Sequence, residues 1–242
     1  MTDQISGLMQ VKKVAILCPV LILLNCSFKE SSQSQSKIWT EEFNLEECTF
    51  SSTGKNDYFI LEPGYQLILE EIDQDTTLLV ITVLNSAEKV GGVETRIVEE
   101  RESVNGKLVE ISRNYFAFCT QTNSVFYFGE EVDIYKDGKV VSHDGGWRAD
   151  SNGAKPGLMI PGIILLGAKY YQEIAPGVAM DRAEIVSNTA TLQTPAGSFE
   201  NCLITEETTP LEPRSREDKI YAPGVGLIKD GELSLIEHGF VN

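Results

Sequence analysis

Short apolar segments separated by turn dipeptides follow one another along most of this chain, a pattern typical of antiparallel strands. Three dipeptides, Asn105-Gly106, Asp137-Gly138 and Asp230-Gly231, lie between such segments. They suit two-residue hairpin turns because these residue types tolerate positive φ angles. A fourth turn is predicted at Pro195-Ala196-Gly197. The four predicted hairpins join these segments: Val93–Val104 to Lys107–Phe118, Val125–Tyr135 to Lys139–His143, Val225–Ile228 to Leu233–Ile236, and Ala190–Gln193 to Phe199–Glu206.

Two further strands are predicted at Tyr65–Ile72 and Thr77–Leu84. The residues from Thr77 to Val83 are all apolar or β-branched, so we expect this strand to be central and covered on both faces. By contrast, apolar or β-branched residues alternate with charged ones in Glu94–Glu102, which suits a sheet with one face toward water.

No segment shows a sustained helical stripe, and the best helix candidate is the short acidic segment Trp39–Glu47. The glycine-rich stretch Trp147–Met180 carries three prolines and little alternation. It is too long for an ordinary connection, yet its many aromatic and aliphatic residues argue against disorder. We expect an ordered flap over one end of the sheet. The predicted fold is mainly β: a curved antiparallel sheet or half-barrel built from hairpins, with this flap and little helix.

The N-terminus has the composition of an export signal. Lys12 and Lys13 precede Val14–Leu24, a run of 11 uncharged residues, whereas a membrane span needs about 20 apolar residues. A basic flank followed by a short apolar run is typical of a secretory signal. Met9 is an alternative start.

The end of the apolar run, Leu23-Leu24-Asn25-Cys26, resembles the lipobox of bacterial lipoproteins. The resemblance implies cleavage before Cys26 and attachment of lipid to its sulfur. Leu23 matches the family pattern, whereas Leu24 and Asn25 stand where small residues are usual. The alternative interpretation is a buried hydrophobic strand with a chance cysteine.

These features divide the chain into a signal peptide (1–25), a flexible tether (26–37) and one β-rich domain (38–242). Ser27–Lys37 is polar and too poor in apolar residues to offset the entropy of ordering it. Ser27 directly after the lipid site favours the outer membrane in the sorting rule of such lipoproteins. We therefore expect a lipid-anchored protein of the cell envelope, at the outer membrane or the periplasmic face, whose membrane contact is the N-terminal lipid.

The net charge of −16 restricts the partners. Removal of residues 1–25 takes away two lysines and one aspartate, leaving 18 basic and 35 acidic residues and a charge of −17. Nucleic acid is excluded as a partner, because its binding needs a basic surface that neutralises phosphates. With only two histidines and no Cys-x-x-Cys pair, we expect no metal site. No cofactor motif is present, and the oligomeric state stays open.

Three cysteines remain after the signal and the lipid site. An oxidising compartment permits at most one intramolecular disulfide among Cys48, Cys119 and Cys202. We favour Cys48–Cys119, because Cys202 lies in a strand-like segment where a buried, inert thiol is expected.

Several strings resemble those of a widespread family of exported bacterial proteins of unknown function. The strings are Tyr127–Gly138, Ala154–Gly157, Tyr170–Glu173, Thr194–Gly197 and Tyr221–Leu227. The resemblance covers about Tyr58 to Ile236 and implies export without an activity. The last two strings are also similar to those of lipoprotein carriers, which implies a curved antiparallel half-barrel.

Two kinds of function are weighed against a plain structural or interaction protein of the envelope. In the first, sheet and flap enclose a cavity that binds a small apolar molecule, a lipid or a peptide. Its mouth would lie near Trp147, Ile160, Tyr170 and Tyr171. We favour this binding module over an enzyme.

The second is an envelope hydrolase that acts on sugars or peptides through carboxylates of the flap. Glu173 and Asp181, with Arg182 beside them, are the weak candidates, because two separated carboxylates serve acid–base chemistry in glycosidases. Alternatively, Arg182 pairs with Asp181 or Glu184 as a surface ion pair. Motifs of serine hydrolases, zinc proteases and phosphate-binding loops are absent from the sequence.

Overall fold

The computed structural model describes residues 39–72 and 75–241. The predicted signal peptide, Cys26 and the predicted tether lie outside the described residues. Residues 39–72 and 75–241 belong to one compact unit. Within the described ranges, the model has no helix with the length and apolar character needed to cross a membrane.

The described chain consists almost entirely of strands. In chain order the elements are η1 (Leu45–Glu47), β1 (Phe50–Ser51), β2 (Gly54–Lys55), β3 (Ile60–Leu61), β4 (Tyr65–Ile72), β5 (Thr76–Val90), β6 (Val93–Val104), β7 (Lys107–Cys119), β8 (Ser124–Lys136), β9 (Lys139–Ser142), β10 (Trp147–Arg148), β11 (Lys155–Ile160), β12 (Lys169–Tyr171), β13 (Glu173–Ile174), β14 (Arg182–Thr194), β15 (Gly197–Thr208), β16 (Glu217–Ala222), β17 (Gly226–Asp230) and β18 (Leu233–Phe240).

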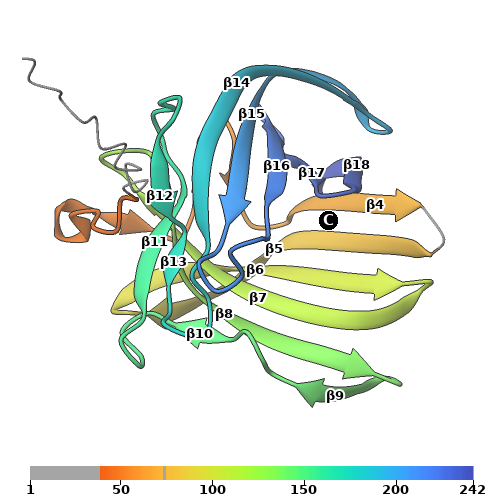
Figure 1. Cartoon of the computed structure of the whole chain (residues 1–242), viewed down its shortest axis with the longest axis horizontal. Coiled ribbons are helices and arrows are strands. Elements are labelled where there is room, and N and C mark those ends of the chain that lie inside the picture. The colour runs from red at the N-terminus through yellow and green to blue at the C-terminus, as the bar shows by residue number, and fades with distance from the viewer. Residues whose placement is uncertain (1–38, 73–74, 242) are drawn as a thin grey trace, which may run out of the picture. The chain divides into compact units, whose positions relative to one another are not determined.

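One large antiparallel sheet curves into a nearly closed barrel, which confirms the predicted fold class. The strand order is β12-β14-β15-β16-β17-β18-β4-β5-β6-β7-β8-β11-β13, so β18 joins the C-terminal strands to β4. In Figure 1, β4–β8 run side by side across the lower part while β14 and β15 arch above them. The end strands β12 and β13 are separated in the chain by Gln172 alone, and the barrel closes at this point.

The predicted hairpins are present. Asn105-Gly106 and Asp137-Gly138 form two-residue turns in which all four residues have positive φ, and Thr194 pairs with Gly197 around the third turn. The last turn differs from its prediction, because Asp230 belongs to β17 and pairs with Leu233 across Gly231-Glu232. The sequence prediction missed the turn at Gly91-Gly92, where β5 continues to Val90.

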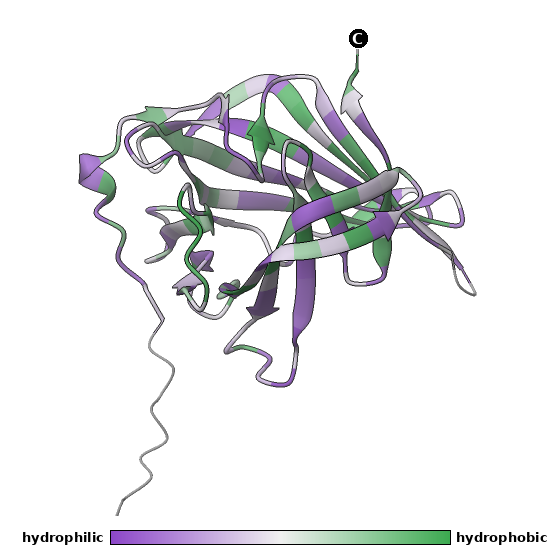
Figure 2. Ribbon diagram, turned by 90° about the horizontal axis from the view of Figure 1, so that it is seen from above, coloured by the Kyte–Doolittle hydropathy of each residue, from purple (hydrophilic) through white to green (hydrophobic). Residues whose placement is uncertain are grey.

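Two local predictions are wrong. The helix predicted over Trp39–Glu47 is only the single turn η1, because Thr40 is extended and exchanges backbone hydrogen bonds with Lys169 and Tyr171. The central strand β5 is not covered on both faces. Leu79 and Val83 are buried, whereas Leu78 and other residues of its outer face are only half-buried. The alternation of hydropathy along the long strands is visible in Figure 2.

The stretch 147–180 is ordered, as expected, but it forms part of the wall and is not a flap. Its strands β10 and β11 pair with β8, β12 pairs with β14, and β13 pairs with β11. The wall is tightest at Gly157, where an added Cβ would lie 2.5 Å from backbone atoms of Tyr171 and Gln172. A side chain at this position would push the two ends of the sheet apart.

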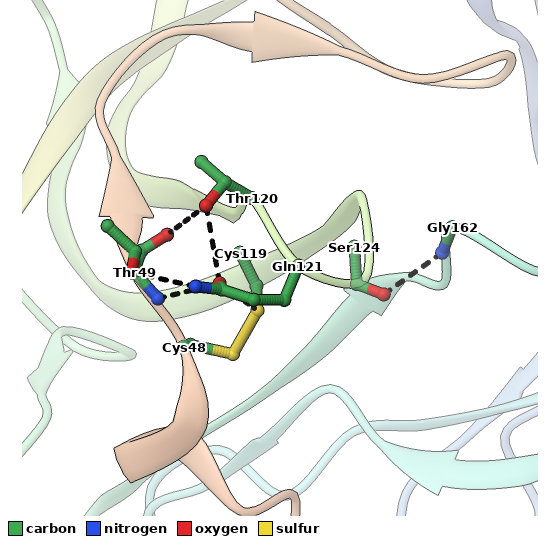
Figure 3. The surroundings of a disulfide bond; sticks show 7 residues. All are labelled: Cys48, Thr49, Cys119, Thr120, Gln121, Ser124 and Gly162. Carbon is green, nitrogen blue, oxygen red and sulfur yellow. Dashed lines mark hydrogen bonds between the residues drawn. A yellow bond between two sulfur atoms is a disulfide. The ribbon is translucent and has the colours of Figure 1, made fainter.

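The N-terminal segment is fastened across the outer side of β7 and β8. A disulfide joins Cys48 to Cys119, the pair favoured from the sequence, while Cys202 is a buried free thiol. Beside the disulfide, the Gln121 amide and the Thr49 backbone and hydroxyl exchange hydrogen bonds of 2.7 Å (Figure 3).

Further along, residues 56–61 cover one end of the barrel. The Asn56 amide donates to the carbonyl of Asn123, the Tyr58 hydroxyl donates to that of Asn201, and the backbone of Asp57 accepts from Gly224. These contacts reach three separate parts of the wall, so this end of the barrel is closed.

Candidate functional site

The inner face of the barrel encloses a cavity with three parts, and Glu100 and Lys219 line all three. The part beside residues 56–61, which we call the apolar end, has a volume of about 80 Å³. The central part measures about 200 Å³, and the part near the β6–β7 turn, which we call the acidic mouth, about 260 Å³. Glu217 at the acidic mouth is exposed to solvent.

Side chains of opposite chemistry line the two ends. The apolar end is lined mainly by aromatic and aliphatic residues, among them Phe59, Leu67, Ile81, Val98, Phe116 and Leu227. The acidic residues that line the centre and the mouth are Glu100, Glu102, Glu110, Glu130, Glu173, Asp181, Glu207, Glu217 and Asp230. The cavity is therefore amphipathic along its length.

Strand register explains why so many carboxylates meet. Alternate residues of a strand face the same side, so Val98, Glu100 and Glu102 of β6 all point inward. Glu102 lies directly opposite Glu110 of β7, although like charges in this position destabilise a sheet. The prediction of one wet face for β6 is therefore incomplete: charged residues occupy both of its faces, and one set lies inside the barrel.

Among the residues that line these three parts, Lys219 is the one basic side chain. Its Nζ lies 3.3 Å from a carboxylate oxygen of Asp230 and 3.6 Å from one of Glu207. Burial opposes the charge on Lys219, but these two carboxylates outweigh that effect and raise its pKa well above the ordinary value. Lys219 thus carries its charge at neutral pH.

The carboxylates at the centre resist ionisation. Burial raises the pKa of Glu100 to about 7, against a smaller lowering effect of Lys219. Burial also raises the pKa of Glu130 to about 7, although the nearby hydroxyls of Ser112 and Tyr127 lower it. The pKa values of Glu173 and Glu207 are raised for the same reason. The cavity therefore holds groups that change charge near neutral pH.

Hydrogen bonds fix several of these groups. The Gln172 amide, at the closure of the barrel, donates to Glu207 at 2.9 Å, and Glu173 accepts from the backbone N–H of Asp181 at 2.6 Å. On β7, Ser112 donates to Glu110 at 2.8 Å. These bonds orient the carboxylates without adding positive charge.

Three polar atoms around the cavity have no hydrogen-bond partner within the described part of the chain: Trp147 Nε1, Tyr170 Oη and Tyr221 Oη. The exposed fractions of these residues are 6%, 3% and 2%. Trp147 lines the centre and Tyr221 lines the apolar end. Burying a polar group without a partner costs about 1–3 kcal/mol, so these atoms are either structural defects or contacts kept for a ligand.

The predicted ligand-binding residues separate into two groups. Trp147 lines the cavity, and Tyr170 carries one of the unpartnered hydroxyls. Ile160 is fully buried in the core. Tyr171 packs edge-on against Trp39, so it does not face the cavity. The predicted mouth stays a prediction, and the strands of this segment pair with β8 and β14 of the barrel wall.

The predicted catalytic candidates also separate. Glu173 and Asp181 line the centre of the cavity together. Arg182 instead stacks on the Trp39 ring, with 4.5 Å between the guanidinium carbon and the ring centroid. Lys169 pairs with Glu184 at 2.9 Å. Arg182 thus does not contribute to this site.

A second hollow of about 580 Å³ lies at the other side of Trp147. Its charges are largely compensated: Arg113 contacts Asp133 at 3.0 Å, and Arg148 contacts Glu131 at 2.8 Å. In the barrel interior the carboxylates far outnumber the one lysine, so we take the interior as the candidate site.

No protein-family model, curated protein or solved structure matches this chain. The resemblance to exported bacterial proteins stays a prediction, and the argument for function depends on the cavity alone.

Proposed function

We propose that this protein is an exported, lipid-anchored binding module whose barrel interior holds one small amphipathic molecule. The observation that carries the proposal is the cavity, with an apolar end under residues 56–61 and a polar centre that contains buried, unpartnered donors. Binding sites for small molecules are typically concave, mostly apolar and supplied with a few convergent polar groups.

Native mass spectrometry of the protein purified from its own host tests the binding function. The expected result is a bound mass of a few hundred daltons (roughly the size that such cavities enclose) that is lost on denaturation. A matched variant, Val98→Trp, fills the apolar end and should abolish the bound mass. A clean apo mass in repeated preparations would leave a structural or interaction protein without ligand.

Hydrolysis of an envelope sugar or peptide is the second candidate. It is favoured by one observation: Glu130, Glu173 and Asp181 line the same space, and burial raises their pKa values. A carboxylic acid with a raised pKa serves as a general acid. Turnover of envelope glycans or peptides by the wild type, and its loss in Glu173→Gln, would support the hydrolase over the binding module.

The lipid anchor is tested separately with the full chain in a bacterial host. We expect radiolabelled fatty acid to be incorporated into the wild type and not into Cys26→Ala. Label that survives this substitution would refute the lipid site. The binding proposal would stand in either case, because it rests on residues of the barrel between Phe59 and Leu233.

A further inference from the structure

We propose that the polar part of the cavity binds the amine or ammonium group of an organic cation, with the apolar part of that molecule at the apolar end. The inference rests on the proposed binding function and adds the chemical class of the ligand. Three independent features of the described residues carry it: the balance of charge, the placement of aromatic rings and the unpartnered polar atoms.

The first feature is the uncompensated negative charge. Lys219 is already shared between Glu207 and Asp230. None of Glu100, Glu130 and Glu173 forms an ion pair with a basic side chain of the described chain within 4.0 Å. Buried charges in proteins are normally paired, so a cation that enters between these groups would supply the missing partner. An anionic headgroup, such as a fatty-acid carboxylate, would meet repulsion instead.

The second feature is a group of aromatic rings beside the carboxylates. Phe116 and Tyr127 stack with ring centroids 4.8 Å apart, and Trp147 meets Tyr127 edge-on at 5.2 Å. All three residues line the central part together with Glu100 and Glu130. Aromatic faces attract ammonium groups, and this attraction grows when water is excluded.

The third feature is the pair of unpartnered atoms that line the cavity. Tyr221 lies in the part of the apolar end that Glu100 and Lys219 also line, so its hydroxyl is able to accept a hydrogen bond from an amine there. The Trp147 N–H at the centre only donates and so requires an acceptor. Both residues are more than nine-tenths buried. These atoms suit a ligand that carries an amine together with a hydroxyl or carbonyl oxygen.

A bare metal ion fits the site less well than an organic cation. Within residues 39–72 and 75–241, no group of three or more histidine, cysteine, aspartate or glutamate side chains is arranged to hold a metal ion. Phe116 and other aromatic side chains occupy part of the space that oxygen ligands would need.

The test is calorimetric titration of the purified full chain at pH 8 and low salt with three probes of equal chain length: octylamine, octanol and octanoic acid. We expect octylamine to bind at least tenfold more tightly than the other two. Glu100→Gln and Glu130→Gln should each weaken octylamine at least tenfold and leave octanol unchanged. The exposed Glu237→Gln, on β18, is the matched control and should bind as the wild type does.

The outcomes separate the two proposals. Equal binding of the three probes, or tighter binding of octanoic acid, would refute the proposal that the ligand is a cation and would leave the binding function standing. Binding of none of the probes, together with a clean apo mass, would overturn both. A thermal melt of each variant shows whether it is folded. If either glutamine variant fails to fold, competition of octylamine by salt decides, since only ion pairing gives a strong salt dependence.

Discussion

Replacing Glu100 with glutamine should make the protein more stable at pH 8 and leave its stability at pH 5 nearly unchanged. Glutamine has almost the shape of a protonated glutamate, so the substitution removes the negative charge and little else. The charge lies inside the barrel, next to Glu130 and Glu110, and Lys219 is already engaged with Glu207 and Asp230. An ionised Glu100 is therefore an unfavourable group in the folded protein.

The magnitude follows from the pKa. Burial raises the pKa of Glu100 from 4.5 to about 7, and one unit corresponds to about 1.4 kcal/mol. The folded state therefore holds this proton more tightly than the unfolded state does. Stability from this group is complete below pH 4.5, falls as pH rises toward 7, and is lost above it. The full difference is about 3 kcal/mol, and the water in the cavity reduces the expected gain of the variant to about 1–2 kcal/mol.

Urea unfolding followed by circular dichroism at pH 5 and pH 8 measures the difference. The free energy of unfolding of Glu100→Gln should exceed that of the wild type by about 1–2 kcal/mol at pH 8, and by under about 0.5 kcal/mol at pH 5. Glu237→Gln, on the exposed part of β18, controls for a general effect of net charge. A gain that is equal at both pH values, or a loss at pH 8, would refute the reasoning.

Three further substitutions test the rest of the structure. Lys219→Met removes the cation shared by two carboxylates, so urea unfolding at pH 8 should show a loss of about 2–4 kcal/mol; an unchanged midpoint would mean that the carboxylates are already neutral. The double variant Cys48→Ala/Cys119→Ala opens a link between positions 71 residues apart, and the unfolding free energy should fall by about 2–4 kcal/mol, whereas reducing agent should not destabilise the variant further. Gly157→Ala forces a methyl group against the backbone at Gln172, which should cost about 1–3 kcal/mol in thermal melts.

The sequence by itself determined the hairpins, because turn chemistry is local. Asn105-Gly106 needs only the φ preferences of two residues to reverse the chain, and the flanking segments then pair in the single register that such a turn allows. The strand Tyr65–Ile72 was predicted with the bounds that the structure has.

Results

Sequence analysis

Short apolar segments separated by turn dipeptides follow one another along most of this chain, a pattern typical of antiparallel strands. Three dipeptides, Asn105-Gly106, Asp137-Gly138 and Asp230-Gly231, lie between such segments. They suit two-residue hairpin turns because these residue types tolerate positive φ angles. A fourth turn is predicted at Pro195-Ala196-Gly197. The four predicted hairpins join these segments: Val93–Val104 to Lys107–Phe118, Val125–Tyr135 to Lys139–His143, Val225–Ile228 to Leu233–Ile236, and Ala190–Gln193 to Phe199–Glu206.

Two further strands are predicted at Tyr65–Ile72 and Thr77–Leu84. The residues from Thr77 to Val83 are all apolar or β-branched, so we expect this strand to be central and covered on both faces. By contrast, apolar or β-branched residues alternate with charged ones in Glu94–Glu102, which suits a sheet with one face toward water.

No segment shows a sustained helical stripe, and the best helix candidate is the short acidic segment Trp39–Glu47. The glycine-rich stretch Trp147–Met180 carries three prolines and little alternation. It is too long for an ordinary connection, yet its many aromatic and aliphatic residues argue against disorder. We expect an ordered flap over one end of the sheet. The predicted fold is mainly β: a curved antiparallel sheet or half-barrel built from hairpins, with this long flap and little helix.

The N-terminus has the composition of an export signal. Lys12 and Lys13 precede Val14–Leu24, a run of 11 uncharged residues, whereas a membrane span needs about 20 apolar residues. A basic flank followed by a short apolar run is typical of a secretory signal. Met9 is an alternative start.

The end of the apolar run, Leu23-Leu24-Asn25-Cys26, resembles the lipobox of bacterial lipoproteins. The resemblance implies cleavage before Cys26 and attachment of lipid to this cysteine. Leu23 matches the family pattern, whereas Leu24 and Asn25 stand where small residues are usual. The alternative interpretation is a buried hydrophobic strand with a chance cysteine.

These features divide the chain into a signal peptide (1–25), a flexible tether (26–37) and one β-rich domain (38–242). Ser27–Lys37 is polar and too poor in apolar residues to offset the entropy of ordering it. Ser27, directly after the lipid site, favours the outer membrane in the sorting rule of such lipoproteins. We therefore expect a lipid-anchored protein of the cell envelope, at the outer membrane or the periplasmic face, whose membrane contact is the N-terminal lipid.

The net charge of −16 restricts the partners. Removal of residues 1–25 takes away two lysines and one aspartate, leaving 18 basic and 35 acidic residues and a charge of −17. Nucleic acid is excluded as a partner, because its binding needs a basic surface that neutralises phosphates. With only two histidines and no Cys-x-x-Cys pair, we expect no metal site. No cofactor is expected, and the oligomeric state stays open.

Three cysteines remain after the signal and the lipid site. An oxidising compartment permits at most one intramolecular disulfide among Cys48, Cys119 and Cys202. We favour Cys48–Cys119, because Cys202 lies in a strand-like segment where a buried, inert thiol is expected.

Several strings resemble those of a widespread family of exported bacterial proteins of unknown function. The strings are Tyr127–Gly138, Ala154–Gly157, Tyr170–Glu173, Thr194–Gly197 and Tyr221–Leu227. The resemblance covers about Tyr58 to Ile236 and implies export without an assigned activity. The last two strings are also similar to those of lipoprotein carriers, which implies a curved antiparallel half-barrel.

Two kinds of function are weighed against a plain structural or interaction protein of the envelope. In the first, sheet and flap enclose a cavity that binds a small apolar molecule, a lipid or a peptide. Its mouth would lie near Trp147, Ile160, Tyr170 and Tyr171. We favour this binding module over an enzyme.

The second is an envelope hydrolase that acts on sugars or peptides through carboxylates of the flap. Glu173 and Asp181, with Arg182 beside them, are the weak candidates, because two separated carboxylates serve acid–base chemistry in glycosidases. Alternatively, Arg182 pairs with Asp181 or Glu184 as a surface ion pair. Motifs of serine hydrolases, zinc proteases and phosphate-binding loops are absent from the sequence.

Overall fold

The computed structural model describes residues 39–72 and 75–241. The predicted signal peptide, Cys26 and the predicted tether lie outside the described residues. Residues 39–72 and 75–241 belong to one compact unit. Within the described ranges, no helix has the length and apolar character needed to cross a membrane.

The described chain consists mostly of strands. In chain order the elements are η1 (Leu45–Glu47), β1 (Phe50–Ser51), β2 (Gly54–Lys55), β3 (Ile60–Leu61), β4 (Tyr65–Ile72), β5 (Thr76–Val90), β6 (Val93–Val104), β7 (Lys107–Cys119), β8 (Ser124–Lys136), β9 (Lys139–Ser142), β10 (Trp147–Arg148), β11 (Lys155–Ile160), β12 (Lys169–Tyr171), β13 (Glu173–Ile174), β14 (Arg182–Thr194), β15 (Gly197–Thr208), β16 (Glu217–Ala222), β17 (Gly226–Asp230) and β18 (Leu233–Phe240).

One large antiparallel sheet curves into a nearly closed barrel, which confirms the predicted fold class. The strand order is β12-β14-β15-β16-β17-β18-β4-β5-β6-β7-β8-β11-β13, so β18 joins the C-terminal strands to β4. In Figure 1, β4–β8 run side by side across the lower part while β14 and β15 arch above them. The end strands β12 and β13 are separated in the chain by Gln172 alone, so the two ends of the sheet approach each other there.

The predicted hairpins are present in this sheet. Asn105-Gly106 and Asp137-Gly138 form two-residue turns in which all four residues have positive φ. The hairpin of β14 and β15 turns where predicted, with Thr194 paired to Gly197. Local turn chemistry therefore positions most of the long strands.

Two turns differ from the sequence prediction. Asp230 belongs to β17 and pairs with Leu233, so the turn is Gly231-Glu232 and lies one residue later than predicted. The turn at Gly91-Gly92 is missing from the prediction; there β5 continues to Val90 and pairs with β6.

The predicted helix over Trp39–Glu47 is wrong. Only the single turn η1 forms, because Thr40 forms backbone hydrogen bonds with β12 instead. Its N–H donates to the carbonyl of Lys169 at 2.9 Å, and its carbonyl accepts from the N–H of Tyr171 at 3.0 Å. The start of the described chain thus lies against β12.

The central strand β5 is not covered on both faces as predicted. Leu79 and Val83, which face the inside of the barrel, are buried, whereas Leu78 and Val80 on the outer face are only half-buried. Figure 2 shows hydrophobic and hydrophilic residues alternating along the long strands. The outer face of this sheet is thus partly open to solvent.

The stretch 147–180 is ordered, as expected, but it forms part of the wall and is not a flap. Its strands β10 and β11 pair with β8, β12 pairs with β14, and β13 pairs with β11. The wall is tight at Gly157, where an added Cβ would lie 2.5 Å from backbone atoms of Tyr171 and Gln172. A side chain at this position would push the two ends of the sheet apart.

A disulfide fastens the N-terminal segment to β7. It joins Cys48 to Cys119, the pair favoured from the sequence, while Cys202 is a buried free thiol. Beside the disulfide, the Gln121 side-chain amide accepts from the Thr49 backbone and donates to the Thr49 hydroxyl, both at 2.7 Å (Figure 3).

Further along, residues 56–61 cover one end of the barrel. Their polar groups form hydrogen bonds of 3.1 Å to Asn123, 3.0 Å to Asn201 and 2.7 Å to Gly224. These three partners belong to separate parts of the wall, so the segment closes this end.

Candidate functional site

The inner face of the barrel encloses a cavity with three parts, and Glu100 and Lys219 line all three. The part beside residues 56–61, which we call the apolar end, has a volume of about 80 Å³. The central part measures about 200 Å³, and the part near the β6–β7 turn, which we call the acidic mouth, about 260 Å³. Glu217 at the acidic mouth is exposed to solvent.

Side chains of opposite chemistry line the two ends. The apolar end is lined mainly by aromatic and aliphatic residues, among them Phe59, Leu67, Ile81, Val98, Phe116 and Leu227. The acidic residues that line the centre and the mouth are Glu100, Glu102, Glu110, Glu130, Glu173, Asp181, Glu207, Glu217 and Asp230. The cavity is therefore amphipathic along its length.

Strand register explains why so many carboxylates meet. Alternate residues of a strand face the same side, so Val98, Glu100 and Glu102 of β6 all point inward. Glu102 lies directly opposite Glu110 of β7, although like charges in this position destabilise a sheet. The prediction of one wet face for β6 is therefore incomplete: charged residues occupy both of its faces, and one set lies inside the barrel.

Lys219 is the one basic side chain among the described residues that line these three parts. Its Nζ lies 3.3 Å from a carboxylate oxygen of Asp230 and 3.6 Å from one of Glu207. Burial opposes the charge on Lys219, but these carboxylates outweigh that effect and raise its pKa well above the ordinary value. Lys219 thus carries its charge at neutral pH.

Two carboxylates at the centre resist ionisation. Burial raises the pKa of Glu100 to about 7, against a smaller lowering effect of Lys219. Burial also raises the pKa of Glu130 to about 7, although the nearby hydroxyls of Ser112 and Tyr127 lower it. The cavity therefore holds groups that change charge near neutral pH.

Two neighbouring carboxylates share this environment and are held by hydrogen bonds. The Gln172 side chain donates to Glu207 at 2.9 Å, and Glu173 accepts from the backbone N–H of Asp181 at 2.6 Å. Burial raises the pKa values of both Glu173 and Glu207. These bonds orient the carboxylates without adding positive charge.

Three polar atoms around the cavity have no hydrogen-bond partner within the described part of the chain: Trp147 Nε1, Tyr170 Oη and Tyr221 Oη. The exposed fractions of these residues are 6%, 3% and 2%. Trp147 lines the centre and Tyr221 lines the apolar end. Burying a polar group without a partner costs about 1–3 kcal/mol, so these atoms call for a ligand or water as partner.

The predicted ligand-binding residues separate into two groups. Trp147 lines the cavity, and Tyr170 carries one of the unpartnered hydroxyls. Ile160 is fully buried in the core. Tyr171 packs edge-on against Trp39 at the start of the described chain. The predicted mouth stays a prediction, and the strands of this segment pair with β8 and β14 of the barrel wall.

The predicted catalytic candidates also separate. Glu173 and Asp181 line the centre of the cavity together. Arg182 instead stacks on the Trp39 ring, with 4.5 Å between the guanidinium carbon and the ring centroid. The next residue of its strand, Ala183, is fully buried on the opposite face. Arg182 is thus directed away from the two carboxylates.

The residues that sequence reasoning missed are Glu100, Glu130, Glu207 and Lys219. Each lies in a strand with charged neighbours, and a segment of this composition is predicted to be exposed to solvent. The signal that was available is the apolar residue two positions away, such as Val98 before Glu100, which places the carboxylate on the covered face.

A second hollow, of about 580 Å³, shares Glu130 and Trp147 with the cavity. Its charges are largely compensated, because Arg113 forms an ion pair with Asp133 at 3.0 Å and Arg148 forms one with Glu131 at 2.8 Å. In the barrel interior the carboxylates far outnumber the lysine, so we take the interior as the candidate site.

No protein-family model, curated protein or solved structure matches this chain. The resemblance to exported bacterial proteins stays a prediction, and function is inferred from the cavity alone.

Proposed function

We propose that this protein is an exported, lipid-anchored binding module whose barrel interior holds one small amphipathic molecule. The observation that supports the proposal is the cavity, with an apolar end under residues 56–61 and a polar centre beside buried, unpartnered donors. Binding sites for small molecules are typically concave, mostly apolar and supplied with a few convergent polar groups.

Native mass spectrometry of the protein purified from its own host tests the binding function. The expected result is a bound small molecule that is lost on denaturation. A matched variant, Val98→Trp, fills the apolar end and should abolish the bound mass while the fold is retained in a thermal melt. A clean apo mass in repeated preparations would leave a structural or interaction protein without ligand.

Hydrolysis of an envelope sugar or peptide is the second candidate. One observation favours it: Glu130, Glu173 and Asp181 line the same space, and burial raises their pKa values. A carboxylic acid with a raised pKa serves as a general acid. Turnover of envelope glycans or peptides by the wild type, and its loss in Glu173→Gln, would support the hydrolase over the binding module.

The lipid anchor is tested separately, with the full chain in a bacterial host. We expect radiolabelled fatty acid to be incorporated into the wild type and not into Cys26→Ala. Label that survives this substitution would refute the lipid site. The binding proposal would stand in either case, because it rests on residues of the barrel between Phe59 and Leu233.

A further inference from the structure

We propose that the polar part of the cavity binds the amine or ammonium group of an organic cation, whose apolar part occupies the apolar end. The inference rests on the proposed binding function and adds the chemical class of the ligand. Three features of the described residues carry it: the balance of charge, the placement of aromatic rings and the unpartnered polar atoms.

The first feature is the uncompensated negative charge. Lys219 is already shared between Glu207 and Asp230. Within the described residues, the ion pairs of Lys219 are with Glu207 and Asp230, and Lys219 attracts Glu100 without forming an ion pair with it. Buried charges in proteins are normally paired, so a cation that enters between these groups would supply the missing partner. An anionic headgroup, such as a fatty-acid carboxylate, would meet repulsion instead.

The second feature is a group of aromatic rings beside the carboxylates. Phe116 and Tyr127 stack with ring centroids 4.8 Å apart, and Trp147 meets Tyr127 edge-on at 5.2 Å. All three residues line the central part together with Glu100 and Glu130. Aromatic faces attract ammonium groups, and this attraction grows when water is excluded.

The third feature is the pair of unpartnered atoms on residues that line the cavity. Tyr221 lies in the part of the apolar end that Glu100 and Lys219 also line, so its hydroxyl is able to accept a hydrogen bond from an amine there. The Trp147 N–H at the centre only donates and so requires an acceptor. Both residues are more than nine-tenths buried. These atoms suit a ligand that carries an amine together with a hydroxyl or carbonyl oxygen.

A bare metal ion fits the site less well than an organic cation. Within residues 39–72 and 75–241, no group of three or more histidine, cysteine, aspartate or glutamate side chains is arranged to hold a metal ion. Hard cations such as Ca²⁺ need about six to eight oxygen ligands, whereas Phe116 and other aromatic side chains line part of this space.

The test is calorimetric titration of the purified full chain at about pH 8 and low salt with three probes of equal chain length: octylamine, octanol and octanoic acid. We expect octylamine to bind at least about tenfold more tightly than the other two. Glu100→Gln and Glu130→Gln should each weaken octylamine about tenfold and leave octanol unchanged. Glu237→Gln, on the exposed side of β18, is the matched control and should bind as the wild type does.

The outcomes separate the two proposals. Equal binding of the three probes, or tighter binding of octanoic acid, would refute the proposal that the ligand is a cation and would leave the binding function standing. Binding of none of the probes, together with a clean apo mass, would overturn both. If a glutamine variant fails to fold in a thermal melt, the salt dependence of octylamine binding to the wild type decides, because an ion pair is weakened by salt and an apolar contact is not.

Discussion

Replacing Glu100 with glutamine should make the protein more stable at pH 8 and leave its stability at pH 5 nearly unchanged. Glutamine has almost the shape of a protonated glutamate, so the substitution removes the negative charge and little else. That charge lies inside the barrel, where Glu130, Glu110 and Asp230 repel it and Lys219 attracts it. An ionised Glu100 is therefore an unfavourable group in the folded protein.

The magnitude follows from the pKa. Burial raises the pKa of Glu100 from 4.5 to about 7, and one unit corresponds to about 1.4 kcal/mol. The folded state therefore holds this proton more tightly than the unfolded state does. Its contribution to stability is complete below pH 4.5, falls as the pH rises, and is lost above about pH 7. The full difference is about 3 kcal/mol, and screening by water in the cavity reduces the expected gain to about 1–2 kcal/mol.

Urea unfolding followed by circular dichroism at pH 5 and pH 8 measures this difference. The free energy of unfolding of Glu100→Gln should exceed that of the wild type by about 1–2 kcal/mol at pH 8, and by under about 0.5 kcal/mol at pH 5. Glu237→Gln controls for a general effect of net charge, because Glu237 is exposed. A gain that is equal at both pH values, or a loss at pH 8, would refute the reasoning.

Three further substitutions test other parts of the structure. Lys219→Met removes the cation shared by two carboxylates, so urea unfolding at pH 8 should show a loss of about 2–4 kcal/mol; an unchanged midpoint would mean that those carboxylates are already neutral. The double variant Cys48→Ala/Cys119→Ala opens a link between positions 71 residues apart. Its unfolding free energy should fall by about 2–4 kcal/mol, and reducing agent should destabilise only the wild type. Gly157→Ala forces a methyl group against the backbone where the sheet ends meet, which should cost about 1–3 kcal/mol in thermal melts. Val140→Ala, on the exposed strand β9, is the control that leaves the closure intact. An equal loss of stability in the two variants would contradict a tight closure.

The hairpins were determined by the sequence itself, because turn chemistry is local. Asn105-Gly106 needs only the φ preferences of two residues to reverse the chain, and the flanking segments then pair in the register that the turn allows. The strand predicted at Tyr65–Ile72 has the same bounds in the structure. The pairing of strands that are adjacent in the chain could therefore be predicted from the sequence.

Contacts between distant segments could not be read in this way. The strands of residues 147–180 are only two to six residues long, too short to give a periodic pattern of their own. They become strands because β8 and β14, the long strands before and after this stretch, offer them open edges. The sequence shows an ordered, apolar segment, and only the closing of the barrel makes it a wall.

The candidate site depends still more on the tertiary structure. Alternation along β6 separates its side chains into two faces, but glutamates occupy both, so the pattern alone does not tell which face is enclosed. Closure of the sheet decides this: it turns Glu100 inward and brings it near Lys219 of β16, more than a hundred residues later. The burial that raises the pKa of Glu100 arises only from that closure, because it comes from the surrounding wall and not from neighbours in the chain.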